Sequence, residues 1–273
     1  MTDRLPDSTL LHLVEPFTGP IVEMWPTERG FMSDVLMLID GELGRFFVKG
    51  VRNRAGGRRD SLVRERVIND AVRSVSPPLR WHTENDRWTV LGFERVEGRP
   101  ARFEPGSPDL PAVLDLLGRI GQIPLPELAE DWHETRWDAF AADEAEALLF
   151  RGDSLIHGDV APGNFLVGEA GSWAVDWAWP TRGARFVDPS FLVLQLIAAG
   201  HAPADAERLV SPCPAWAESD PRGIDAFARA NLRMFRHRAL RFPEQAWLRD
   251  MERTARLWVE HRTALVGGSR LHG

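Results

Sequence analysis

Short apolar runs separated by polar turns form the clearest pattern in the middle of the chain. Residues 155–156 and 165–167 are apolar and enclose a polar loop, and residues 173–175 follow a Gly-Glu-Ala-Gly-Ser turn. Apolar runs of this length, bounded by Gly, Asn, Asp and Ser, are typical of β-strands joined by tight turns. The pattern therefore predicts a β-hairpin that is preceded by a loop over residues 157–164.

The first hundred residues carry the pattern of an antiparallel sheet. Runs rich in Val, Ile, Phe and Trp alternate with turns that contain Gly, Asp or Pro, which favours strands over helices. Strands are predicted at residues 21–25, 35–39, 45–49 and 88–93, with a turn at 40–44. Lys49 ends the third of these strands.

Apolar residues recur at helical spacing in the remaining segments. The spacing predicts helices at residues 60–75, 110–117, 137–148, 189–199, 204–210, 223–241 and 244–265. The basic segment 52–59 is predicted as a mobile loop, and Asp188 is predicted to cap the helix that starts at Pro189. A helix-rich C-terminal part thus follows a mainly β N-terminal part.

Composition excludes several classes of protein. The net charge of −7 disfavours a general nucleic-acid-binding surface. No apolar run approaches the ~18–20 residues of a membrane span, and the N-terminus lacks the apolar core of a signal peptide. Cys213 is the single cysteine, so an internal disulfide is excluded and we expect a cytoplasmic protein that does not bind membranes.

The basic residues are almost entirely of one type. Of 33 Lys and Arg residues, all but Lys49 are arginine. A compact ammonium and a planar guanidinium are not interchangeable, because they differ in charge density and in the geometry of their donors. The position of Lys49 therefore suggests a site that needs a point charge.

Three oxygen-bearing side chains emerge from the predicted hairpin and its loop, namely Asp159, Asn164 and Asp176. Asp159 precedes Asn164 by five residues, and Asp176 follows twelve residues later. Such a set suits phosphoryl transfer, in which a carboxylate accepts the acceptor's proton and oxygen ligands hold Mg²⁺ beside the phosphates. Asp and Asn are also common in ordinary turns, which is the alternative interpretation. No Gly-x-x-x-x-Gly-Lys-Ser/Thr motif occurs, so a P-loop nucleoside triphosphatase is excluded.

His157-Gly158-Asp159, with Asn164 and then Val175-Asp176-Trp177, resembles the motifs of the aminoglycoside phosphotransferase family. This family is the small-molecule branch of the protein-kinase-like fold and has His-Gly-Asp where protein kinases have His-Arg-Asp. The resemblance extends over about residues 20–200. It implies an α+β, bilobal fold in which a cleft between the lobes holds ATP or GTP with Mg²⁺.

The resemblance also implies a division of the chain into lobes. Residues 1–97 would form a small nucleotide-binding lobe with an antiparallel sheet and one helix. Residues 98–273 would form a larger, mainly helical lobe for catalysis and acceptor binding.

Roles in nucleotide binding follow from the same resemblance. Lys49 would contact the phosphates, and Glu65 on the next helix would pair with Lys49. Gly30 and Ser33 take the place of the phosphate-covering loop, although Gly-x-Gly-x-x-Gly is absent. The backbone groups that would bind the adenine edge are those of Phe93, Glu94 and Val96.

In the catalytic loop, the resemblance makes Asp159 the residue that aligns and deprotonates the acceptor hydroxyl. Asn164 and Asp176 would bind Mg²⁺, and His157 would brace the loop. Family members often carry Asp-Pro-x-x-Asp after the hairpin. Here Leu192 stands at the last of these positions, so the second acid is missing.

The implied reaction is transfer of the γ-phosphoryl group to a hydroxyl of a small molecule. The acceptor would be an aminoglycoside, another antibiotic or a related metabolite, and antibiotic resistance would be one biological role. A cationic acceptor would suit a pocket lined by carboxylates. The acids in the region that would line it are Asp205, Glu207, Glu218 and Asp220, each of which is otherwise a solvated surface charge.

Two other functions remain as alternatives. A catalytically idle kinase-like binding or regulatory protein would keep the fold, but the intact motif residues argue against it. A protein kinase is disfavoured because Gly158 replaces the motif arginine and the segment between Asp176 and Asp188 is short. The Ala-Pro-Glu motif of protein kinases is also absent.

Overall fold

The computed structural model describes residues 7–27 and 33–269, with side chains to residue 265. The chain divides into two compact units. The first unit ends at Glu97 and also contains Ala174–Trp179. The second unit begins at Gly98 and contains the other residues. Lys49 and Asp176 therefore belong to the same unit although they are far apart in the sequence.

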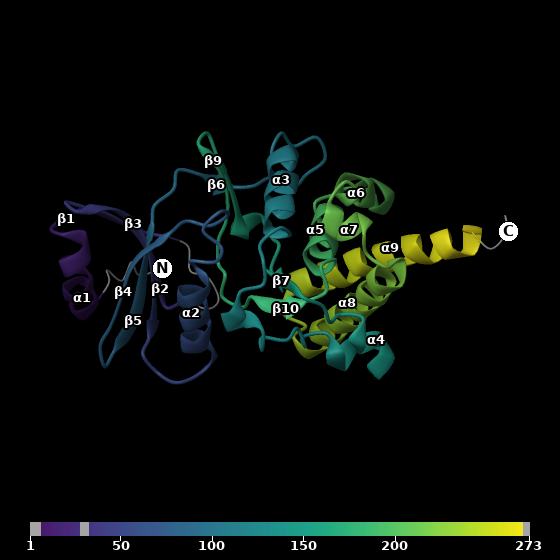
Figure 1. Ribbon diagram of the computed structural model, residues 1–273, viewed down its shortest axis with the longest axis horizontal. Coiled ribbons are helices and arrows are strands. Elements are labelled where there is room, and N and C mark those ends of the chain that lie inside the picture. The colour runs from purple at the N-terminus through teal and green to yellow at the C-terminus, as the bar shows by residue number, and fades with distance from the viewer. Residues whose placement is uncertain (1–6, 28–32, 270–273) are drawn as a thin grey trace. The chain divides into compact units, whose positions relative to one another are not determined.

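The first unit contains a five-stranded antiparallel sheet in the order β1-β2-β3-β5-β4 (Figure 1). Its strands are β1 Ile21–Pro26, β2 Val35–Gly41, β3 Gly44–Arg52, β4 Leu79–Glu84 and β5 Trp88–Glu94. The four strands predicted from the sequence are confirmed, but β3 continues beyond Lys49 to Arg52. The edge strand β4 was not predicted, because Trp81 is its one buried side chain and alternation is hard to recognise.

Helices α1 (Ser8–Thr18) and α2 (Gly57–Ile68) cover opposite faces of this sheet (Figure 1). Successive strand side chains point to opposite faces, so Val90 packs in the core with Leu10 of α1 while Leu91 packs with Leu62 of α2. The sequence predicted α2 and not α1. Helix α1 closes an additional core against the sheet, which contains its residues Leu10 and Val14.

Helix α2 differs from its predicted span of 60–75. It begins at Gly57, within the segment expected to be a mobile loop, and it ends at Ile68. The early end has a local cause, because the Asn69 side chain donates to the Pro77 carbonyl and accepts from the Leu79 amide. Such side-chain bonds to nearby backbone groups compete with helix continuation.

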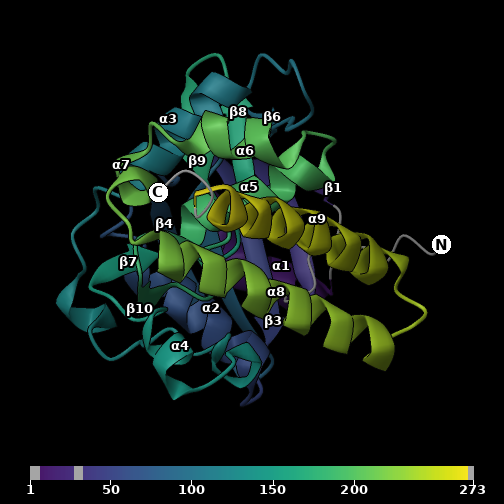
Figure 2. The same ribbon diagram turned by 90° about the vertical axis from the view of Figure 1, so that its right-hand side faces the viewer.

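The second unit is mainly helical (Figure 2). Its helices are α3 Leu110–Ile120, α4 Glu144–Leu148, α5 Val187–Ala198, α6 Pro203–Val210, α7 Pro214–Ala217, α8 Pro221–Arg241 and α9 Ala246–Ser269. Short strands accompany them, namely β6 Arg99–Pro100, β7 Ser154–Ile156, β8 Phe165–Gly168, β9 Gly171–Ala174 and β10 Thr181–Gly183. Short 3₁₀ turns lie at Glu127–Ala129, Asp138–Phe140 and Pro162–Asn164. Helices α8 and α9 lie side by side along much of their length (Figure 2).

Five of the predicted helices in this unit are confirmed as α3, α5, α6, α8 and α9. The predicted helix over 137–148 is wrong. A 3₁₀ turn at Asp138–Phe140 is followed by the separate short helix α4, in which the Asp143 side chain accepts from the Glu146 amide. That cap starts a new helix, and Leu148 remains 60% exposed, so its apolar character did not mark a core position.

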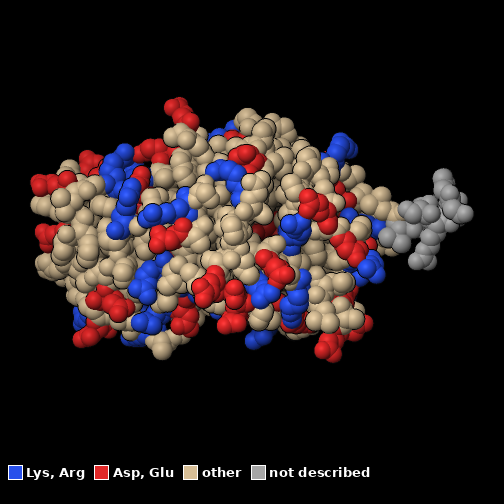
Figure 3. Space-filling view, viewed as in Figure 1, with Lys and Arg blue, Asp and Glu red and all other residues tan. Residues whose placement is uncertain are grey.

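Charged side chains of both signs are interspersed over the face shown in Figure 3. Many are paired; Arg262, for example, binds both Asp225 and Glu207. Within the described ranges of the chain, no helix is both long and apolar enough to cross a membrane.

Candidate active site

Lys49 lies on the face of the sheet that α2 covers. Its neighbour Val48 belongs to the core on the α1 side, so the alternation along β3 turns Lys49 toward α2. Glu65 follows Leu62 by about one helical turn and shares its face of α2. The two side chains form a buried ion pair, with Lys49 Nζ 2.7 Å from Glu65 Oε2 and side-chain exposures of 8% and 6%.

Asp176 completes this cluster and belongs to the later segment of the first unit, Ala174–Trp179. The Lys49 ammonium donates a hydrogen bond to its carboxylate, which is 38% exposed. Among the described residues, Asp176 is the sole non-glycine residue with positive φ, at 63°. Left-handed backbone at such a residue costs about 1–3 kcal/mol and is concentrated at functional sites. The backbone strain supports a specific role for this carboxylate.

The charges of this cluster depend on one another. Burial alone would lower the pKa of Lys49, but the carboxylates of Glu65 and Asp176 outweigh burial and raise that pKa. Burial raises the pKa of Glu65, and the Lys49 charge opposes this effect only in part. The ammonium is therefore held in its charged form where a phosphate oxygen would need it.

Of the two predicted phosphate-loop residues, Gly30 lies outside the described residues. Ser33 is buried, at 5% exposure, and its Oγ makes no hydrogen bond to any described part of the chain. Burial of a hydroxyl group without a hydrogen-bond partner is unfavourable, because the group has lost its hydrogen bonds to water. Ser33 is therefore able to donate to a ligand.

The predicted adenine-binding backbone lies at the end of β5. Phe93 is buried in the core with Leu62, and the Glu94 amide already donates to the Pro78 carbonyl. The Val96 amide donates to no backbone carbonyl of the described chain. Of the three predicted positions, Val96 thus offers a donor, whereas Glu94 retains only its carbonyl as a candidate.

The loop predicted to be catalytic, residues 157–164, connects β7 to β8 within the second unit. Gly158 and Val160 are buried, whereas Asp159 between them is exposed. The Asn164 amide nitrogen donates at 2.9 Å to both the backbone carbonyl and the carboxylate of Asp159. The loop therefore presents the Asp159 carboxylate to solvent in a fixed relation to Asn164.

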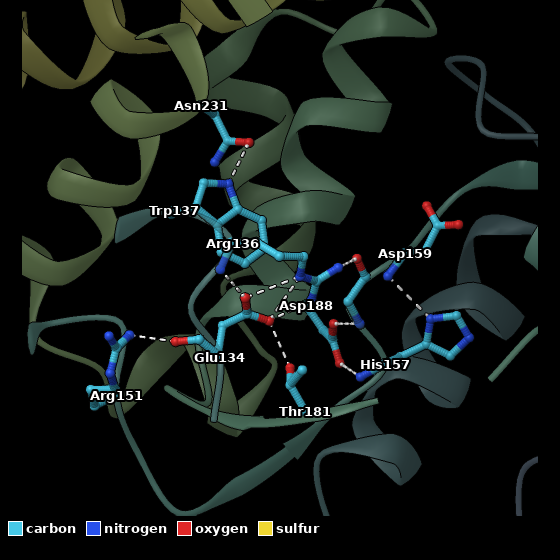
Figure 4. A network of polar contacts seen from close by, with 10 residues as sticks. Glu134, Arg136, Trp137, Arg151, His157, Asp159, Thr181, Asp188 and Asn231 are labelled. Atoms are coloured by element: carbon cyan, nitrogen blue, oxygen red, sulfur yellow. Dashed lines mark hydrogen bonds and ion pairs between the residues drawn. The ribbon is translucent and has the colours of Figure 1, made fainter. Parts of the chain in front are cut away.

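His157 and Asp188 are buried and form hydrogen bonds with the backbone amides of this loop. His157 is buried against the Phe165 ring, and its Nδ1 accepts from the Asp159 amide at 3.2 Å. Asp188 accepts from the His157 and Gly158 amides at 2.8 Å each (Figure 4). Burial raises the pKa of Asp188, and His157 and these amide donors counteract the rise.

The predicted helix-capping role of Asp188 is wrong. Helix α5 starts at Val187, so Asp188 lies inside its first turn and its carboxylate is directed to the catalytic loop. An Asp-Pro pair at the start of a helix does not show whether the Asp caps the helix or accepts hydrogen bonds from another segment. The sequence analysis did not predict this contact because the partner amides lie 30 and 31 residues earlier.

The structure brings the predicted site residues together in two groups. Lys49, Glu65 and Asp176 meet in the first unit, and Asp159 meets Asn164 in the second. One oxygen each of Asn164 and Asp176 takes part in no hydrogen bond of the described residues. Amide and carboxylate oxygens are suitable ligands for Mg²⁺, which usually takes only one or two carboxylates besides phosphates and water.

The acids considered for a cationic acceptor are engaged in ion pairs or hydrogen bonds. Glu207 accepts from Trp258 Nε1 at 2.7 Å and pairs with Arg262. The others pair with Arg side chains, Asp205 with Arg208, Glu218 with Arg185 and Asp220 with Arg222. Asp220 also caps α8 through the Arg222 amide. These contacts favour a structural role for all four.

No family model and no curated protein matches the sequence. The fold, however, is similar to that of solved antibiotic phosphotransferases. A thermostable mutant of aminoglycoside phosphotransferase APH(4)-Ia, bound to AMP-PNP and hygromycin B, has a TM-score of 0.60 and 14% identity. The match covers 92% of this chain and 99% of that chain.

Two further solved structures are similar over most of their length. Spectinomycin phosphotransferase APH(9)-Ia, with ADP and spectinomycin, has a TM-score of 0.58 and 13% identity over 94% of this chain and 95% of that chain. Macrolide 2′-phosphotransferase MphH from Brachybacterium faecium has a TM-score of 0.55 and 14% identity, covering 91% and 98%. The predicted α+β, kinase-like fold is thereby confirmed.

Proposed function

We propose that this protein is a small-molecule phosphotransferase that moves the γ-phosphoryl group of ATP or GTP to a hydroxyl group. The observation that carries the proposal is the buried Lys49 ammonium held between Glu65 and Asp176. A buried cation with two fixed carboxylates is an expensive arrangement for stability alone. It suits phosphoryl transfer, because that reaction depends on positioning and on neutralising phosphate charge.

The first unit would bind the nucleotide. Lys49 contacts its phosphates, and Glu65 keeps Lys49 in place. The unpartnered Ser33 hydroxyl supports a contact to phosphate, and the unused Val96 amide supports a contact to the base. Gly30, before Ser33, would belong to the same phosphate-covering loop.

Asn164 and Asp176 would hold Mg²⁺ through their unused oxygens. When bound, the ion neutralises the charge that develops on the phosphate oxygens. Lys49 would move its hydrogen bond from Asp176 toward a phosphate oxygen, since the Glu65 contact is the more buried of the two.

Asp159 would align the acceptor hydroxyl and take its proton. The carboxylate is exposed, and its backbone and side chain are held by Asn164, His157 and the buried loop around it. Hydroxyl groups lose their proton late in a loose transition state, so alignment matters at least as much as basicity.

The acceptor class follows from the structural neighbours as a proposal. One of those neighbours was solved with spectinomycin, a second with hygromycin B, and a third is a macrolide 2′-phosphotransferase. We propose an antibiotic or a related hydroxylated metabolite as acceptor, with resistance as one biological role. We expect the protein to act in the cytoplasm, where ATP and GTP are available.

The test is nucleotide consumption with Mg²⁺ and either ATP or GTP against a panel of acceptors. The panel contains spectinomycin, hygromycin B, a macrolide, nucleosides, choline, homoserine and polyols, with a generic protein substrate as comparison. We expect acceptor-dependent release of nucleoside diphosphate with at least one small molecule, and a phosphorylated product by mass spectrometry. Nucleotide turnover with the protein substrate alone would contradict the proposal.

A further inference from the structure

The carbonyl group next to Asp159 has a partner from a distant part of the second unit. Arg136 Nη1 donates to the Gly158 carbonyl at 2.9 Å (Figure 4). This bond and the His157 bond act on a single peptide group, because the Gly158 carbonyl and the Asp159 amide are joined by one planar bond. The Asp159 amide donates to His157 Nδ1. The plane that leads into Asp159 is therefore held at both ends.

Arg136 is itself held by the buried carboxylate of Glu134. Glu134 is 0% exposed, and its two oxygens accept from Arg136 Nε at 3.0 Å each. The same carboxylate accepts from the Arg136 amide and from the Thr181 hydroxyl at 2.6 Å. A paired guanidinium with this many fixed partners keeps one orientation.

The segment that carries Glu134 is attached to the strands beneath the catalytic loop. The Glu134 amide donates to the Arg182 carbonyl of β10 at 2.8 Å, and β10 pairs with β7. On its other side the Arg136 guanidinium lies over the Trp137 ring at 4.8 Å, and Trp137 donates to Asn231 of α8. Figure 4 shows the bond from Trp137 to Asn231 and the bonds between Arg136 and Glu134.

Gly158 accommodates this guanidinium because it has no side chain. A Cβ atom at Gly158 would lie 2.1 Å from Arg136 Nη2, closer than any real contact. The backbone of Gly158 also has a φ of 74°, which residues other than glycine rarely adopt. Glycine at the centre of the His-Gly-Asp motif is thus matched to an arginine that occupies the space beside it.

We propose that Arg136, oriented by Glu134, is a positioning residue that sets the direction of the Asp159 carboxylate through the Gly158 carbonyl. The inference rests on the proposed function, in which Asp159 aligns the acceptor. Arg136 would act through the loop backbone, by its bond to the Gly158 carbonyl. Misplacement of a catalytic group by about 1 Å can lower a rate by ~10²-fold.

The first test uses Arg136→Lys and the double variant with Arg136→Met and Glu134→Gln. Lysine retains a cation for the buried Glu134, but one ammonium cannot serve both carboxylate oxygens and the Gly158 carbonyl. The double variant removes both charges together, so no unpaired charge remains buried. Folding of each variant is checked by thermal unfolding before kinetics.

The control is Arg229→Lys. Arg229 also binds a buried carboxylate, that of Glu146 at 2.8 Å, and Arg233 remains as a second partner. Its contacts lie with α4 and α8. This variant therefore reproduces the loss of a buried Arg–Glu contact without a bond to the catalytic loop.

The kinetic readout separates positioning from a general loss of structure. We expect kcat to fall about 10–100-fold in both Arg136 variants, with the KM for the nucleotide within about 3-fold and Arg229→Lys close to wild type. Turnover is measured with the best acceptor of the panel and, independently, as hydrolysis of MgATP with water as acceptor. An unchanged kcat in both variants would overturn the inference.

Amide hydrogen exchange gives a readout that does not depend on activity. We expect faster exchange in peptides that cover residues 156–160 for the Arg136 variants, and unchanged exchange in those peptides for Arg229→Lys. Unaltered exchange in this loop would refute the inference even if phosphotransfer were established. If the Arg136 variants show faster loop exchange but the wild-type protein transfers phosphate neither to an acceptor nor to water, the proposed function is refuted and the inference about the loop is not.

Discussion

The ammonium of Lys49 donates a hydrogen bond to the carboxylate of Asp176, which lies 127 residues later in the chain. Both residues belong to the first unit, because the segment Ala174–Trp179 returns to it. Lys49 is bound on its other side by the almost fully buried Glu65. Of the two carboxylates that bind Lys49, Glu65 is buried and Asp176 is partly exposed. A phosphate and its metal ion would therefore bind on the side of Asp176.

Lys49→Arg keeps the positive charge but replaces a point donor by a wider fork. Lys49 is 6% exposed, so the bulkier guanidinium cannot keep both the Glu65 and the Asp176 contacts in their present geometry. We expect a large fall in turnover with the fold retained, measured by steady-state kinetics and circular dichroism. Near wild-type turnover would remove Lys49 from the site.

Asp159→Asn is nearly isosteric and removes the carboxylate. Because Asp159 is exposed, packing and nucleotide affinity should change little. General-base catalysis typically contributes ~10²–10⁴-fold, so we expect turnover on the acceptor to fall at least ~10²-fold. Retention of most activity would show that the mechanism is wrong, whatever the fold.

Metal dependence is expected in nucleotide binding. A ligand that binds only the folded state raises the unfolding temperature, and the rise grows with the logarithm of the ligand concentration divided by its dissociation constant. We expect ATP to stabilise the protein much more with Mg²⁺ than with EDTA, by thermal shift. In Asp176→Asn, which tolerates the left-handed backbone, the Mg²⁺-dependent part should shrink; equal shifts in both buffers would count against Asn164 and Asp176 as ligands.

Asp109 makes stability depend on acidic pH. Its carboxylate accepts from Arg99 at 2.6 and 2.8 Å and from the Arg102 amide at 2.9 Å. The Arg99 bond is the main reason that the pKa of Asp109 is lowered to about 2. The unfolded value is about 3.9, so the stabilisation is complete above that pH and is lost as pH falls toward 2.

The measurement is urea unfolding of wild type and Asp109→Asn across this pH range. We expect the variant to be less stable at neutral pH and the difference to shrink as the pH falls through the window between the two pKa values. The control is Asp115→Asn, an exposed carboxylate paired with Arg119, since such pairs contribute only ~0–1 kcal/mol. A difference that stays constant with pH would exclude the Arg99 contact as its source.

Gly92 of β5 is predicted to tolerate no side chain. A Cβ there would lie 2.1 Å from the Trp81 ring, which Phe17 and Phe46 hold from other sides. Overpacking of this kind costs typically about 1–3 kcal/mol, and we expect Gly92→Ala to lower the free energy of unfolding by that amount. Gly50→Ala is the matched control in the same sheet, where the nearest atoms lie at 3.8 Å; equal losses in both would contradict the packing argument.

Local patterns in the sequence were enough to predict most elements of this fold. The strands β1, β2, β3 and β5 and the long helices α8 and α9 are recognisable because their apolar periodicity is strong. Element ends were less predictable, because they depend on single contacts. Helix α2 ends where Asn69 binds Pro77 and Leu79, and no periodicity within residues 60–75 reveals those bonds.

The sequence alone determined the candidate residues for the proposed chemistry. Asp159, Asn164 and Asp176 were recognisable from their spacing, and Lys49 from being the single lysine. Their separation along the chain is a property of the sequence and needs no tertiary contact to be seen. The Lys49–Glu65 ion pair was implied by family resemblance and is present in the structure.

Only the tertiary structure decided which residues contact the loop that carries Asp159. Asp188 holds the loop amides instead of capping a helix, and Arg136 reaches the Gly158 carbonyl from 22 residues away. The four acids considered as a lining for a cationic acceptor are bound to arginines or to Trp258. The physical reason is that a hydrogen bond or an ion pair depends on distances of about 3 Å, which chain folding sets between segments whose local sequences carry no record of each other.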